Sequence, residues 1–148
     1  AEKYAVVIVD AGGRDSLEMR QALAVCDLAL LPIRPSQFDA WSLSRMAQLI
    51  ADVSERIGDL VRALAVINCA SPNPVVRETA EVRAYLAEYA DVFPALETAI
   101  TERIAYRKAA REGMGVIELA GGLADPKASL EMLALYREVF DEDFTAQA

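Results

Sequence analysis

The stretch Leu60-Val-Arg-Ala-Leu-Ala-Val-Ile67 is a largely apolar run of strand length, and the turn-rich segment Asn68–Pro74 follows it. Two further apolar runs occupy Tyr4–Val9 and Leu28–Ile33. Continuous rather than alternating apolarity is typical of parallel strands that are covered on both faces. The three runs therefore predict strands of a parallel sheet.

Amphipathic patterns between and after these runs predict helices. The longest begins at Asp39 and ends at Gly58, with apolar residues at spacings of three and four. The last begins at Asp125 and is expected to bury Leu130, Leu133, Tyr136 and Phe140. The other predicted helices are Asp15–Val25, with Asp15 as N-cap, Val75–Tyr89 and Thr101–Glu112, and short extended segments are predicted at Asp91–Pro94 and Gly115–Leu119.

Alternating strands and helices predict an α/β fold, a mostly parallel sheet flanked by helices, as one domain over residues 1–148. The chain has no His, which excludes His-based catalytic triads and the usual zinc ligand sets. A net charge of −8 means that nucleic acid could be bound only through a local basic stripe. Without a run of about 20 apolar residues or a signal peptide, we expect a cytoplasmic protein with no membrane contact.

Ligands of such sheets bind beyond the carboxyl ends of the strands. Asp10 follows the run Tyr4–Val9 directly, and Gly12 and Gly13 come next. A carboxylate there suits Mg²⁺ or its water shell, and glycines let backbone N–H groups approach a phosphate. The alternative interpretation is that Asp10 only begins a turn.

Three segments taken together resemble the ParA family of partition ATPases, which includes MinD-like proteins. They are Tyr4-Ala-Val-Val-Ile-Val-Asp-Ala-Gly-Gly13, Ala24-Val-Cys-Asp-Leu-Ala-Leu-Leu-Pro-Ile-Arg-Pro-Ser36 and Ile100-Thr-Glu-Arg-Ile-Ala-Tyr-Arg-Lys-Ala-Ala-Arg-Glu-Gly113, in the order of the family. The resemblance covers most of the chain. It implies a P-loop ATPase fold, incomplete at the N-terminus, and a role in plasmid or chromosome partition.

The resemblance also implies cofactors, partners and residue roles. ATP and Mg²⁺ would be the cofactors, with Asp10 as the Walker B aspartate near the metal. Gly12 and Gly13 would lie where the family senses the γ-phosphate, although the family more often has Thr-Pro-Pro there. Asn68 would read the adenine edge, or would instead be an Asx-turn residue. The expected partners are a second copy, a centromere-binding partition protein and non-specific DNA.

The glycine-rich phosphate loop of the family is not found in this sequence. Lysine occurs only as Lys3, Lys108 and Lys127, and none lies in a G-x-x-x-x-G-K-[ST] pattern. We therefore expect no ATP hydrolysis by this chain alone. In the family's sheet the phosphate-loop strand lies beside the Walker B strand, so its absence is expected to leave strand edges unpaired and to favour oligomers.

Arg103, Arg107 and Arg111 recur every four residues, with Lys108 beside them. This basic helical face is a candidate contact for the DNA backbone, or it is simply a solvated face that Glu102 and Glu112 partly neutralise. Trp41 is expected in the core, with a partner-facing edge as the alternative. Two functions stay open for the chain: a segment of a ParA-type ATPase, or a non-catalytic adaptor on the same scaffold.

Overall fold

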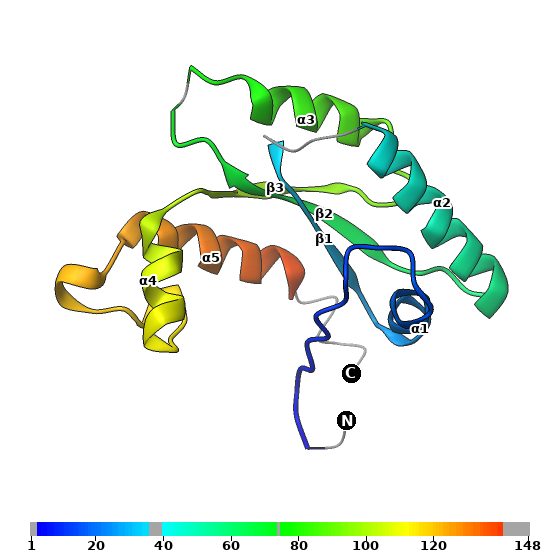
Figure 1. Ribbon diagram of the computed structural model, residues 1–148, viewed down its shortest axis with the longest axis horizontal. Helices are drawn as coiled ribbons and strands as arrows, with labels where there is room; N and C mark the ends of the chain where they lie inside the picture. The colour runs from blue at the N-terminus through cyan, green and yellow to red at the C-terminus, as the bar shows by residue number, and fades with distance from the viewer. Residues whose placement is uncertain (1–2, 36–39, 74, 141–148) are drawn as a thin grey trace.

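The chain folds as a three-stranded parallel sheet with helices on both faces, and the computed structural model describes residues 3–35, 40–73 and 75–140 (Figure 1). This confirms the predicted α/β class. The elements, in chain order, are α1 (Leu17–Val25), β1 (Ala29–Ile33), α2 (Ala40–Ile57), β2 (Ala63–Ala70), α3 (Glu78–Ala87), β3 (Ala95–Thr101), α4 (Ile104–Glu112), the 3₁₀ turns η2 (Val116–Glu118) and η3 (Gly121–Leu123), and α5 (Pro126–Val139).

The middle strand β2 pairs with β1 on one side and with β3 on the other, in the order β1-β2-β3. It begins three residues after the predicted start, at Ala63, and Leu60 is exposed. It also continues through Asn68 to Ala70, where a loop was predicted. This prediction was wrong because β3 provides a ladder for these residues, with Asn68 opposite Ile100.

The two faces of the sheet bury different residues, as the alternation of a strand requires. Ala65 and Ile67 face the side covered by α1, α2 and α3, where the main core lies. Val66 faces the other side and packs with Leu135 and Val139 of α5. The stripe predicted along α2 is confirmed for Leu43, Ile50 and Val53, which are buried, whereas Ile57 is exposed. The prediction that Trp41 lies in the core was wrong, because 68% of this residue is exposed at the start of α2.

The predicted strand Tyr4–Val9 does not form. In Figure 1 this dark blue segment runs outside the sheet, and its residues are all exposed, up to 87% for Ile8. A strand needs a neighbouring ladder for its N–H and C=O groups, and no described strand lies beside this segment. The same pattern of residues therefore gives a strand at Leu28–Ile33, where β2 is the partner, but not here.

Several smaller predictions were also wrong. Ser16, not Asp15, caps α1 by accepting a hydrogen bond from the Met19 N–H, while Asp15 pairs with Arg20 at 2.7 Å. Gly115–Leu119 contains a 3₁₀ turn rather than a strand. The strand β3 begins at Ala95, just after the predicted segment Asp91–Pro94. Asp39 and Pro74 lie outside the described residues, and so does Phe144, near which the last helix is predicted to end.

The helix α5 is turned differently from the prediction. Leu130, Leu133 and Tyr136 are exposed, with 66% of Leu130 accessible, and Phe140 is half-buried beside the Tyr136 ring. The helix turns two glutamates, Glu131 and Glu138, toward β3 because they hydrogen-bond to groups of that edge strand. The side of α5 that faces the sheet therefore carries these two glutamates together with Leu135 and Val139, rather than Leu130, Leu133 and Tyr136.

Candidate functional site at the strand ends and the basic helix

A cavity of about 530 Å³ lies where β2 and β3 end, between the sheet, α4 and α5. Its walls are mainly apolar, and polar groups gather at the strand ends and at the start of α4. The apolar lining residues include Leu30, Pro32, Val66, Ile100, Met132 and Leu135, and the polar ones are Arg34, Asn68, Thr101, Glu102, Arg103, Tyr106 and Arg107.

Asn68 lines this cavity from the end of β2. Its Oδ1 accepts a hydrogen bond from the Cys69 N–H at 2.9 Å, and Cys69 has a positive φ of 56°. Non-glycine residues rarely adopt this left-handed conformation, and the short polar side chain before it stabilises the turn. Asn68 therefore both lines a cavity and makes a local backbone contact.

One carboxylate, that of Glu131, joins three elements beside the cavity. It accepts hydrogen bonds from the N–H of Thr101 at 3.2 Å and from its Oγ1 at 2.9 Å, at the end of β3. It also pairs with the Arg103 guanidinium through Nη2 at 2.6 Å and Nε at 3.2 Å. The Tyr106 hydroxyl, from the first turn of α4, lies 3.4 Å away. We call Thr101, Arg103, Tyr106 and Glu131 the Glu131 cluster.

The electrostatics of the Glu131 cluster favour the ion pair. Burial opposes ionisation of Glu131, but hydrogen bonds from Arg103 and Thr101 outweigh it and lower the pKa of the carboxyl. The hydrogen bond to Glu131 raises the pKa of Arg103. Burial, reinforced by the Glu131 charge, raises the pKa of Tyr106 to about 12, so its hydroxyl remains protonated at neutral pH.

The basic residues predicted to share a helical face fall into two groups. Arg103 is the N-cap of α4, with extended backbone, and only 20% of its side chain is exposed beside Glu131. Arg107, Lys108 and Arg111 lie on α4 itself and are exposed. We call these three residues the basic face; the Arg107 guanidinium lies 3.7 Å from Glu102, and both of these side chains are more than half exposed.

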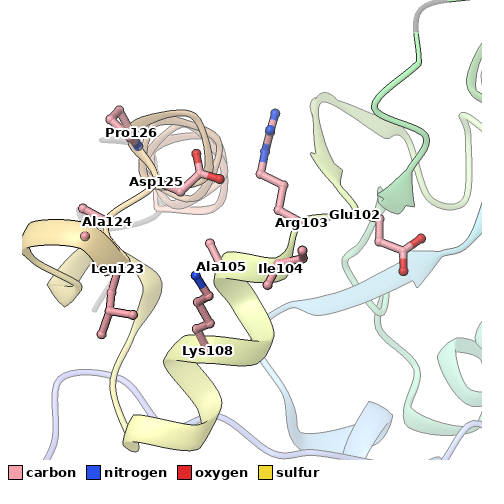
Figure 2. Close-up of a pocket in the computed structure, with 10 residues that line it drawn as sticks. Glu102, Arg103, Ile104, Ala105, Lys108, Leu123, Ala124, Asp125 and Pro126 are labelled. Atoms are coloured by element: carbon pink, nitrogen blue, oxygen red, sulfur yellow. The ribbon is translucent and has the colours of Figure 1, made fainter.

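A second, more open cavity of about 400 Å³ lies between α4 and the start of α5 (Figure 2). Lys108 and Arg103 extend toward the start of α5, where Asp125 lies, whereas Glu102 points away from it. Asp125 caps α5 by accepting hydrogen bonds from the N–H groups of Lys127 and Ala128. Lys108 and Asp125 thus line the same cavity, and the Asp125 carboxylate is already used as a helix cap.

Comparison with known proteins supports the resemblance seen in the sequence. The chain is 34% identical to Protein ParA of Rhizobium radiobacter over 102 residues, which is 69% of this chain and 45% of that protein. It is 28% identical to the maintenance of carboxysome distribution protein A of Halothiobacillus neapolitanus over 119 residues, 80% of this chain and 52% of that protein. The chain is similar to ParA-family proteins. It spans about half the length of these relatives, and no family model matches it.

The residues that the ParA resemblance assigns to ATP and Mg²⁺ do not come together. Asp10, Gly12 and Gly13 are exposed in the irregular segment before α1 and line neither cavity, whereas Asn68 lines the larger one. Among the described residues, no three His, Cys, Asp or Glu side chains are grouped so that they could hold a metal ion. Of the four predicted residues, Asn68 is therefore the one that lies at a described cavity.

Sequence reasoning missed Glu131, Glu138 and Thr101. The signal that could have found the two glutamates is their spacing of seven residues, which places both on one side of a helix. Two acidic residues on the same side of a helix as apolar residues indicate a polar partner on that side.

Within residues 3–35, 40–73 and 75–140, no helix of the ParA-like chain combines the length and apolarity that a membrane span needs.

Proposed function

We propose that this chain is part of a ParA-type ATPase that partitions or positions plasmids, chromosomes or another cargo in the cytoplasm. In the complete protein it would dimerise with ATP, bind DNA without sequence preference and respond to a centromere-binding partition protein. The similarity to Protein ParA and to the maintenance of carboxysome distribution protein A supports this family of functions. The observation that carries the DNA part is the basic face, which is exposed on a chain whose net charge is −8.

The chemistry of the basic face suits a phosphate backbone. Arg107, Lys108 and Arg111 are long cations on two turns of one helix, and each phosphate they neutralise releases condensed counterions. Of these three cations, Arg107 is the one with an ion pair to a described residue, and that contact at 3.7 Å from Glu102 is exposed and weak. A phosphate group could therefore replace Glu102 at little cost.

The ATP and Mg²⁺ part of the proposal concerns the complete protein. Asn68 would contact the adenine from the strand-end cavity, and Asp10, with Gly12 and Gly13, would lie toward the metal and phosphates. For this, Tyr4–Val9 would have to be a paired strand. Titration of the present chain and of the complete protein with ATP and Mg²⁺ tests it: we expect binding by the complete protein only, and no binding by either would contradict the proposal.

The DNA part is tested by charge reversal in the complete protein. We expect K108E/R111E to abolish retention on non-specific duplex DNA in the presence of ATP. The control R56E/R77E reverses two exposed cations at the end of α2 and at the N-cap of α3, and it should bind nearly as well as the wild type. Equal binding by K108E/R111E and by the control would remove the DNA role of this face.

An exposed apolar stripe gives specific support to the adaptor alternative. Leu130, Leu133 and Tyr136 lie exposed along α5, and exposed apolar patches often mark protein contacts. An adaptor would keep this contact without nucleotide. Self-association of the complete protein that is independent of ATP, and that L133E abolishes, would favour the adaptor over the ATPase.

A further inference from the structure

We propose that Arg103 is a positioning residue: Glu131 holds its guanidinium, and the pair fixes the start of α4 so that Arg107, Lys108 and Arg111 contact the DNA phosphates. This inference rests on the proposed DNA binding and deepens it. The sequence groups Arg103 with Arg107, Lys108 and Arg111, but the inference gives Arg103 a different role from the other three. It also assigns a role to Glu131, which the proposed function does not use.

The contacts of Arg103 leave little of its guanidinium group accessible to a phosphate. Both Nε and Nη2 point to Glu131, with the shortest distance at 2.6 Å, and its side chain is 20% exposed against 67% for Arg107. A phosphate that took Arg103 would leave the Glu131 carboxylate partly buried without its cation, which is strongly unfavourable. Arg107 can change partners without such a loss.

The Glu131 cluster is also well placed to hold α4. Thr101 is the last residue of β3 and Arg103 is the N-cap of α4, so one carboxylate binds both ends of the short link between them. The apolar contacts of α4 come from Ala105, Ala109 and the half-buried ring of Tyr106. The polar cluster adds directional hydrogen bonds at the start of the helix, where the small side chains of the alanines allow α4 to shift.

The salt dependence of DNA binding distinguishes a phosphate contact from a positioning residue. Removing one phosphate contact lowers the slope of log K against log salt by about 0.9. In the complete protein we expect R107M to show this loss of slope. We expect R103M to weaken binding several-fold with an unchanged slope, because the three contacting cations remain.

Two conservative variants sharpen the test. R103K keeps the positive charge but cannot form the two-point contact with Glu131. We therefore expect R103K to bind DNA as weakly as R103M. If Arg103 instead contacted a phosphate directly, the lysine of R103K would keep that contact and most of the DNA affinity. E131Q removes a negative charge near the DNA-binding face, so electrostatics alone predicts tighter binding, and the positioning role predicts weaker binding.

A measurement without DNA keeps the inference testable on its own. In E131Q, hydrogen exchange should become faster at the amides of α4 and stay unchanged in α2, and circular dichroism should confirm that the protein is folded. T101V, which removes only the Thr101 hydroxyl contact, should show a smaller change in the same region. Unchanged exchange in α4 of E131Q, or a loss of slope in R103M equal to that in R107M, would overturn the inference. Absence of salt-dependent DNA binding by the folded wild type would instead refute the proposed function.

Discussion

Replacing Glu138 by alanine should open the outer edge of the sheet. Its carboxylate accepts hydrogen bonds from the N–H groups of Glu97 and Thr98, both at 2.8 Å, and from the Thr98 hydroxyl. Hydrogen bonds to a charged group contribute about 1.5–3 kcal/mol each, but water can reach this half-exposed edge and replace part of them. We therefore expect Glu138→Ala to lower the free energy of unfolding by about 2–3 kcal/mol.

The assay is urea unfolding of the purified chain followed by circular dichroism, with light scattering on the same samples. Glu97→Ala is the matched control, because this exposed side chain lies on the same edge strand, and it should change stability by no more than about 0.5 kcal/mol. Glu138→Ala should also associate more, since an uncovered edge offers N–H groups to other strands. Equal losses in the two variants, without added association, would refute the reasoning.

Three further predictions concern the core, the pH dependence and the end of α4. Phe93 is completely buried and stacks on Tyr89 with ring centroids 5.5 Å apart, so Phe93→Ala should cost about 3–5 kcal/mol in urea unfolding, and a loss under about 1 kcal/mol would contradict its place in the core. The pKa of Glu131 is lowered in the folded chain, so the stability that its carboxylate contributes is present above about pH 4.5 and is lost as the pH falls through the folded pKa. The free energy of unfolding should therefore fall more steeply with decreasing pH in the wild type than in E131Q. Parallel plots of this free energy against pH would contradict the prediction. Gly113 ends α4 with a φ of 64°, so Gly113→Ala should lower the melting temperature by an amount equivalent to about 1 kcal/mol. Gly122→Ala is the control, because Gly122 has a negative φ and a Cβ added there would meet open space.

Helices were predicted well from the sequence because their signals are local. The spacing of apolar residues located α2, and Gly113 located the end of α4. Strands depend on partners far along the chain, and there the same pattern had two outcomes. Leu28–Ile33 and Tyr4–Val9 are both apolar runs, yet only the former lies beside β2.

The missed strand β3 shows the opposite case. Its sequence, Ala-Leu-Glu-Thr-Ala-Ile-Thr, is weakly apolar, and only Leu96 and Ile100 are buried. It becomes a strand because β2 provides one ladder and α5 binds its outer edge through glutamates. The candidate site was missed for the same reason: Glu131 and Thr101 are 30 residues apart, and no local pattern brings them together.

The two edges of the sheet differ in the backbone groups that they offer to a further strand. The β3 edge is closed, since Glu138 takes its N–H groups and Arg83 donates to the carbonyl oxygen of Leu96 at 2.9 Å. At the β1 edge, the Ala29 N–H donates a hydrogen bond to the carbonyl oxygen of Arg62, on the β2 side of the strand. Because successive residues of a strand alternate, the backbone groups of Leu30 and Pro32 point to the opposite side, away from β2. Proline is tolerated in this strand because its missing N–H is on the outer side. The side chains of Glu138 and Arg83 thus block the addition of a strand beside β3. A strand added beside β1 would instead meet chiefly the carbonyl oxygens of Leu30 and Pro32. The N–H groups of an exposed segment such as Tyr4–Val9 could donate hydrogen bonds to these oxygens.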